Sequence, residues 1–165
     1  MKYFALSFLF VLLFGELNSQ EKVQFKEPME LAKEIFAIFE KNDSLEIIKL
    51  KPTVDKFKRI IPAETSLLSD EEIYQRYVRD IKMLEDYNRI IESCKAGKLD
   101  WKKFKILDVE TRDKFGKGRP VSFNIIYQYE DKEVDRIYCN AQFFEGEWFL
   151  ISFQHSWDVF EKLRN

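Results

Sequence analysis

The sequence predicts an α+β fold in which N-terminal helices pack on one face of a curved, four-stranded antiparallel meander. Two observations support this prediction. Apolar residues recur at helical spacing between residues 28 and 97, and from Trp101 onward they alternate with polar residues as in strands. The turns between the predicted strands are short, and turns of this length join antiparallel neighbours. A chain of 165 residues without repeats or linkers predicts a single domain over residues 20–165.

The first nineteen residues are expected to be a secretory signal peptide. Lys2 precedes an apolar run from Phe4 to Phe14, and small or polar residues follow as far as Ser19. The run is shorter than the roughly 20 apolar residues that span a bilayer, which argues against the alternative of an uncleaved membrane anchor. No cysteine stands near the expected cleavage site, so we do not expect a lipoprotein. The sequence therefore predicts an exported protein, periplasmic or secreted, with no membrane span after cleavage.

The helical half is predicted to hold four segments: Pro28 to Lys41, Asp43 to Leu50, a turn or two that ends before Pro62, and Ser69 to Lys95. Pro28 suits a first helical position, and Ser69 with Glu72 forms a capping box at the start of the longest segment. Gly97 suits the C-terminal end of that segment. Its expected buried stripe consists of Ile73, Tyr77, Ile81, Leu84, Ile91 and Cys94.

The strand half is predicted to hold residues 101–113, 121–130, 136–144 and 148–155, with a tight Glu145-Gly146 turn before the last strand. Alternation places one set of third-strand residues on the core face: Ile137, Cys139, Ala141 and Phe143. In the last strand it places Phe149, Ile151, Phe153 and His155 on one face, opposite Trp148 and Leu150. Tyr138 and Phe144 are then expected on the outer face, which is therefore partly apolar and suited to a homodimer or partner interface. The alternative is that the C-terminal residues fold over this face.

Composition and missing motifs exclude several classes of function. Lys and Arg total 27 against 29 Asp and Glu, a formal net charge of -2, which provides no basic surface for nucleic acid. The chain has no glycine-rich phosphate loop, no nucleophile elbow and no paired metal-ligand motif. Two cysteines and one histidine are too few for a structural zinc site. We therefore expect no metal and no cofactor.

Two segments carry a family resemblance. The sequence from Phe36 to Ile48, FAIFEKNDSLEII, and the sequence from Glu145 to Phe153, EGEWFLISF, resemble the opening helices and the last hairpin of ketosteroid-isomerase-like domains, also called cystatin-like or nuclear-transport-factor-like. The resemblance implies a cone-shaped half-barrel with a pocket between helices and sheet. Members of this group include isomerases, dehydratases and exported domains with no known chemistry. The segment from Ser69 to Lys95 is longer than usual in these domains and could fill the space that a ligand needs.

The candidate pocket of the cone is lined by Tyr127, Phe149, Phe153 and His155. His155 is the single histidine and would lie at the wide end of the cone, where an acid/base group could meet a substrate. Asp158 or Tyr127 could orient its ring. The alternative is a histidine at the end of a strand that only makes local hydrogen bonds.

Two further groups of residues have competing interpretations. Cys94 and Cys139 both point into the predicted helix–sheet interface, where they form either a disulfide or two buried thiols. Asp108 and Glu110 share a face of the first strand, but they alternate with basic residues, as on a solvated edge strand.

The sequence favours binding over catalysis. We expect an exported, non-catalytic binding domain whose ligand is an apolar small molecule in the cone or a protein, such as an envelope protein, on the sheet. The alternative function is a cofactor-free isomerase or dehydratase that uses His155 with a nearby acid. A third interpretation is a purely structural partner of another envelope protein.

Overall fold

The computed structural model describes residues 24–111, 120–132, 134–154, 160 and 163, and it confirms the predicted α+β fold. A four-stranded antiparallel sheet has the order β1-β2-β3-β4, the meander expected from the short turns. The strands are β1 (Phe104–Thr111), β2 (Val121–Tyr129), β3 (Asp135–Phe144) and β4 (Glu147–Phe153). The helices are α2 (Pro28–Lys41), α3 (Ser44–Lys49), α4 (Val54–Ile60), α5 (Pro62–Thr65), α6 (Asp70–Ile73) and α7 (Ile81–Ala96). A π-helix, η1 (Tyr74–Val78), follows α6, and a 3₁₀ helix, η2 (Trp101–Lys103), precedes β1.

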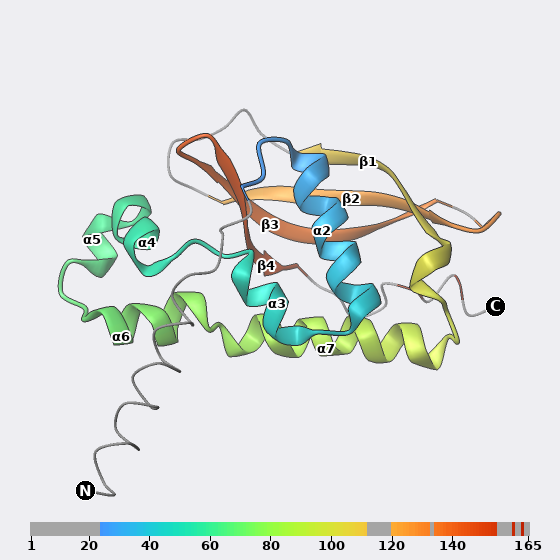
Figure 1. The fold of residues 1–165 in the computed structure, drawn as a ribbon, viewed down its shortest axis with the longest axis horizontal. Coiled ribbons are helices and arrows are strands. Elements are labelled where there is room, and N and C mark those ends of the chain that lie inside the picture. The colour runs from blue at the N-terminus through green and yellow to red at the C-terminus, as the bar shows by residue number, and fades with distance from the viewer. Residues whose placement is uncertain (1–23, 112–119, 133, 155–159, 161–162, 164–165) are drawn as a thin grey trace, which may run out of the picture.

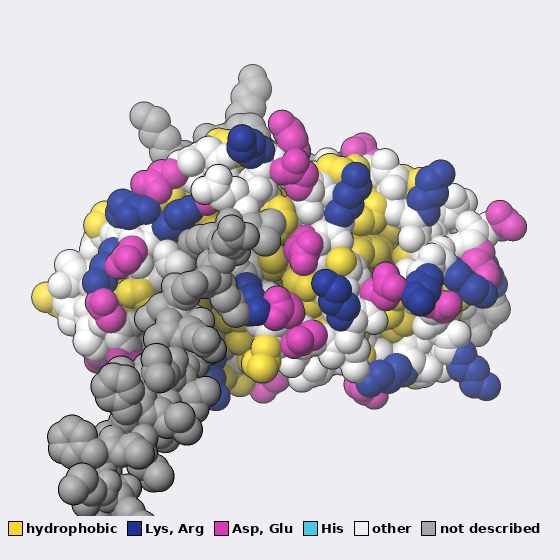
Figure 2. All heavy atoms as spheres, in the orientation of Figure 1, with side chains coloured by type: hydrophobic (Ala, Val, Ile, Leu, Met, Phe, Trp, Pro, Cys, Tyr) yellow, Lys and Arg dark blue, Asp and Glu magenta, His cyan; other side chains and the backbone are white. Residues whose placement is uncertain are grey.

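The helices fall into two groups around the sheet (Figure 1). Helix α2 lies across one face of the sheet, and α7 runs past the end of α3 and beside β4. Helices α4, α5 and α6 lie together at one end of the molecule, and with η1 they form what we call the helical arm. On the face shown in Figure 2, positive and negative side chains are interspersed and form no patch of one sign.

Aromatic rings fill the space between α2 and the sheet. Phe36 and Phe39 project from α2 and meet Trp101 at centroid distances of 5.6 and 4.8 Å. Tyr127 of β2 is fully buried among the rings of Phe36, Phe104 and Phe160. Burying a ring of this size stabilises the fold by about 1.5–3 kcal/mol. The space between α2 and the sheet is therefore a packed core.

The predicted long helix from Ser69 to Lys95 is broken, which corrects the expectation of one continuous helix. Ser69 and Glu72 form the predicted capping box, but the helix then widens into the π-helix and ends before Asp80. The backbone of Asp80, with φ -5° and ψ 91°, is not helical, and its carboxylate accepts a hydrogen bond from the backbone N–H of Met83, so it caps a new helix. The break shifts the helical phase, and Ile81, expected on the buried stripe, is 67% exposed.

The first strand is shorter than predicted. Asp100 accepts the N–H of Lys102 and caps a 3₁₀ turn, so Trp101–Lys103 are helical and β1 starts at Phe104. Residues 112 and 113 lie outside the described residues. The predicted Glu145-Gly146 turn is confirmed: φ is 51° at Glu145 and 82° at Gly146, the backbone of a two-residue hairpin.

A β-bulge reverses the predicted faces of β4. Ala141 pairs with Leu150 and Asn140 pairs with Ser152, so Ile151 is an extra residue with no partner on β3. One extra residue inverts the alternation on either side of it. Leu150 and Trp148 therefore join Phe153 in the core cluster, whereas the expectation had placed them on the opposite face. Phe149 lies on the outer face beside its partner Gln142, with the ammonium of Lys56 4.4 Å from its ring centroid.

The end of β3 also departs from the predicted alternation. Gln142 is buried on the face opposite the core, and Phe143 is 40% exposed, although it was expected in the core. Phe143 instead packs at the margin of the sheet, where its ring lies 5.3 Å from that of Trp148. The outer face near this hairpin is covered by the helical arm through ion pairs of Lys56 with Glu147 and of Arg59 with Glu145.

The helical arm has a small hydrophobic core of its own. Phe57, Ile73 and Val78 are buried together, apart from the main cluster. The ring of Phe57 lies 5.5 Å from that of Tyr77, which connects α4 to the π-helix. The arm thus packs largely on itself, and it meets the sheet at the β3–β4 hairpin.

Candidate functional site

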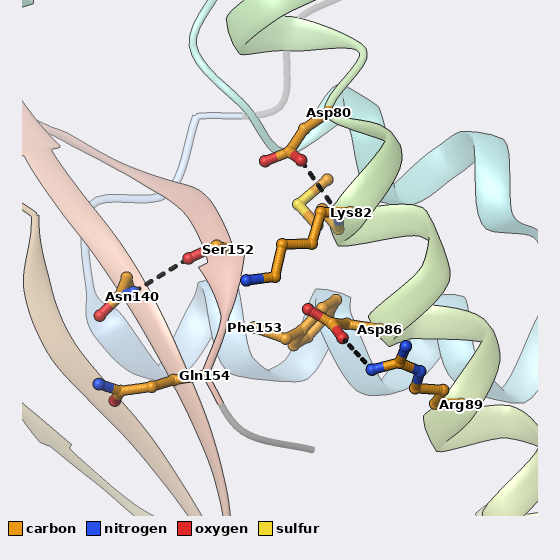
Figure 3. Close-up of a pocket in the computed structure, with 9 residues that line it drawn as sticks. Asp80, Lys82, Asp86, Arg89, Asn140, Ser152, Phe153 and Gln154 are labelled. Carbon is orange, nitrogen blue, oxygen red and sulfur yellow. Dashed lines mark hydrogen bonds and ion pairs between the residues drawn. The ribbon is translucent and has the colours of Figure 1, made fainter. Parts of the chain in front are cut away.

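A cleft of about 410 Å³ lies between α7 and the paired strands β3 and β4 (Figure 3). Five of its lining residues come from α7 or its N-cap: Asp80, Lys82, Met83, Asp86 and Arg89. Four come from the strands and the residue after them: Asn140, Ser152, Phe153 and Gln154. The volume falls within the range of roughly 300–1,000 Å³ typical of small-molecule sites, but its lining is more polar than is usual for such sites.

Asp80 forms one end of the cleft and is held by two contacts. One carboxylate oxygen caps α7 at 3.1 Å from the N of Met83, and the other lies 2.9 Å from Nζ of Lys51. The Lys51 side chain is only 2% exposed, and burial lowers its pKa, an effect that the Asp80 carboxylate partly offsets. This ion pair connects the turn after α3 to the start of α7 and fixes the position of Asp80.

Asp86 and Lys82 face the interior of the cleft one helical turn apart. The Asp86 side chain is nearly buried, and its Oδ1 lies 3.3 Å from a guanidinium nitrogen of Arg89. Figure 3 shows Lys82 reaching from α7 across the cleft toward the strands. Among the described residues, Lys82 has no ion-pair partner. The two carboxylates and two cations that line the cleft sum to a formal charge of zero, and the buried Lys51 behind Asp80 brings the total to +1.

The strand side of the cleft is uncharged. Asn140 and Ser152 are register partners on the outer face of β3 and β4, and the amide Nδ2 of Asn140 donates to Oγ of Ser152 at 2.9 Å. Gln154 follows β4, and its backbone N–H donates to the carbonyl of Tyr138 at 2.9 Å. Met83 and Phe153 are both buried in the core cluster and provide the apolar part of the lining. The side chains therefore project from rigid elements that packing holds in place.

The structure does not bring the predicted pocket residues together. Phe153 lines the cleft, but Tyr127 is buried in the aromatic core and Phe149 lies on the outer face beneath Lys56. The reason is the β4 bulge, which separates Phe149 from Phe153. His155 and Asp158 lie outside the described residues, so the catalytic role expected for them stays a prediction.

The two cysteines are buried free thiols in the structure. The Sγ of Cys94 donates to the carbonyl of Leu99 at 3.3 Å, and that of Cys139 donates to the carbonyl of Phe123 at 2.9 Å. Burial raises the pKa of Cys94 to about 11 and raises that of Cys139 as well, so both are protonated and unreactive at neutral pH. The sequence left open a disulfide or two buried thiols, and the structure contains two buried thiols.

The acidic residues of β1 occupy the solvated edge that the sequence indicated. Asp108 and Glu110 pair with Ile126 and Asn124 of β2, which puts both on the outer face, and both are exposed. Glu110 forms an ion pair with Arg136 at 3.4 Å.

Within the described ranges, no group of three or more His, Cys, Asp or Glu side chains is arranged to hold a metal ion. The helices among the described residues include none with the length and hydropathy needed to cross a membrane.

Sequence reasoning missed the cleft residues, although two signals point to them. Asp80 is a good N-cap residue three positions before Met83, and Ser152 is the one polar residue between Trp148 and Phe153. Neither signal places α7 beside β4. That proximity depends on long-range packing, which local patterns do not encode.

No protein-family model, curated protein or solved structure matches the chain. The resemblance to ketosteroid-isomerase-like domains therefore stays a prediction, and the functional argument starts from the cleft.

Proposed function

We propose that the chain is an exported, non-catalytic binding domain that holds a small polar ligand of no net charge in the cleft between α7 and β4. The single observation that carries this proposal is the cleft itself, in which largely paired charges and neutral hydrogen-bonding groups surround about 410 Å³ on rigid elements. Export is supported by the predicted signal peptide over residues 1–19.

The charges of the cleft favour a ligand without net charge. Asp80 pairs with Lys51 and Asp86 with Arg89, so these four charges present no net field to an anion or a cation. The remaining charge of the lining, the ammonium of Lys82, is exposed and therefore screened by water. The cleft provides both hydrogen-bond donors and hydrogen-bond acceptors, from the side chains of Lys82, Asp86, Asn140 and Ser152. A ligand that both donates and accepts hydrogen bonds would satisfy them.

Binding is better supported than catalysis because the described cleft lacks an activated nucleophile. Its one hydroxyl, Ser152, accepts a hydrogen bond from the Asn140 amide, and an amide cannot serve as the base that serine chemistry requires. An apolar ligand in the cone has less support, since Tyr127 and its neighbours already fill that space with one another.

Native mass spectrometry of the chain recovered from the exported fraction of its own cells tests the proposal. We expect a non-covalent small-molecule mass on the wild-type chain. Ser152→Phe, which blocks the cleft, should lose that mass, whereas Ser66→Phe, the same change at an exposed site in the helical arm, should keep it. Lys82→Glu serves as a second cleft variant, because it changes an exposed residue and leaves the core intact.

Circular dichroism and a urea titration establish that each variant is folded. A bare wild-type chain would overturn the proposal. The same bound mass on both folded cleft variants would also overturn it, because the ligand would then occupy another site.

A further inference from the structure

The polar lining of the cleft continues onto the outer face of the sheet. Ser122, Asn140 and Ser152 are register partners across β2, β3 and β4, so three uncharged polar side chains form a row that ends in the cleft. All three are half-buried, and Ser152 and Asn140 are hydrogen-bonded to each other. The sequence had predicted a partly apolar outer face here, with Trp148 and Leu150 exposed, and both of these side chains are instead in the core.

An aromatic ring stands beside this row. Tyr138 precedes Asn140 by two positions on β3, so both side chains project from the outer face about 7 Å apart along the strand. The Tyr138 ring is 40% exposed and has the Arg136 guanidinium carbon 5.9 Å from its centroid. The backbone of Gln154, which lines the cleft, pairs with the Tyr138 carbonyl. The cleft and the aromatic ring therefore belong to one continuous surface.

From this surface we infer that the ligand is a short uncharged saccharide that occupies the cleft and extends over Tyr138. The inference rests on the proposed function. A sugar hydroxyl both donates and accepts, as do the amide of Asn140 and the hydroxyls of Ser122 and Ser152. The Asp86 carboxylate accepts from hydroxyls and the Lys82 ammonium donates to them. The apolar C–H face of a sugar ring packs against an exposed aromatic ring, which is the role we assign to Tyr138.

The principal competing ligand is a zwitterion such as a free amino acid. Asp86 would bind its ammonium group and Lys82 its carboxylate. Such a ligand fits within the cleft and leaves Tyr138 uncontacted. The involvement of Tyr138 therefore separates the two classes.

Isothermal titration of the mature chain tests the inference with two sets of probes. One set holds tri- and tetrasaccharides of glucose, galactose, mannose and N-acetylglucosamine, and the other holds the common free amino acids. We expect a saccharide to bind and Tyr138→Ala to weaken it about tenfold through loss of ring contact. Tyr138→Phe, which keeps the ring, should bind like wild type.

Phe143→Ala is the matched control, because Phe143 is an equally exposed aromatic residue of the same strand on the opposite face. It should leave saccharide affinity unchanged. Saccharide binding that is equally strong in folded Tyr138→Ala would overturn the placement over Tyr138. Binding of an amino acid but of no saccharide, abolished by Lys82→Glu, would overturn the saccharide inference and leave the proposed function standing. If no saccharide and no amino acid binds, and native mass spectrometry shows no small molecule on the chain, then the saccharide inference and the proposed function are both overturned.

Discussion

Asp80→Asn isolates the contribution of the Lys51–Asp80 ion pair to stability. Asparagine caps a helix about as well as aspartate, so the hydrogen bond from the N–H of Met83 is kept while the charge that faces Lys51 is removed. The Lys51 ammonium then stays buried, at 2% exposure, without a carboxylate. Removing one partner of a fully buried pair costs about 3–5 kcal/mol. Because Asp80 is 27% exposed, we expect a smaller loss of unfolding free energy, about 2–3 kcal/mol.

The same substitution should make stability more dependent on pH. Burial already lowers the pKa of Lys51 below its ordinary value of 10.5, and loss of the carboxylate lowers it further. The unfolded chain then holds this proton more tightly than the folded chain does. The unfolding free energy therefore rises as pH increases from the lowered folded pKa toward 10.5, and it should rise more in the variant than in wild type.

Urea titrations followed by tryptophan fluorescence at several pH values between 7 and 10 provide the measurement. The control is Glu92→Gln, which removes an exposed ion pair with Lys95 on the same helix and should cost no more than about 0.5 kcal/mol. Adding Lys51→Met to Asp80→Asn should recover most of the loss, since no buried charge remains. The reasoning is refuted if Asp80→Asn costs no more than Glu92→Gln, or if its stability is independent of pH.

Three further predictions concern buried groups. The folded chain should not react with a thiol reagent at pH 7, since Cys94 and Cys139 are buried and protonated, and both should react once urea unfolds it. A mass 2 Da lower in the absence of reductant would instead indicate a disulfide. Tyr87→Phe removes a hydroxyl that donates to the carbonyl of Ile38 at 3.3 Å, and urea unfolding should show a loss of about 1 kcal/mol; no loss would mean that this bond is not formed. Asn124→Val should raise the unfolding free energy by about 1 kcal/mol, because the buried amide Nδ2 of Asn124 has no hydrogen-bond partner among the described residues. A destabilised variant would show that this amide is satisfied.

The fold class could be predicted because its signals are local. The apolar stripe of α2, the Ser69 capping box and the alternation along β2 each depend on residues close in sequence. Each is confirmed, except that the polar Asn124 of β2 is also buried. The faces of β4 could not be predicted from alternation. Between Trp148 and Phe153 five of the six residues are apolar, so the pattern contains no information on which of them is the extra residue of a bulge.

The candidate site could not be predicted for a different reason. Its two walls are about sixty residues apart in sequence, and each wall alone resembles a solvated surface: charges on a helix, or polar residues on an outer strand face. The break at Asp80 decides how α7 lies against β4. The sequence does not indicate this break, because the apolar periodicity continues through Asp80 as in an unbroken helix. Sequence reasoning therefore selected the aromatic residues that form the core.

The separate small core of the helical arm has a consequence for the order in which the molecule opens. Only three buried apolar residues hold the arm together, against the much larger cluster beneath the sheet, so its amide protons should exchange with solvent well before those of β2 and β3. Asp80 stands where the arm meets α7. A local opening of the arm would therefore release one wall of the cleft while the sheet stays folded, and ligand bound there would slow exchange in the arm.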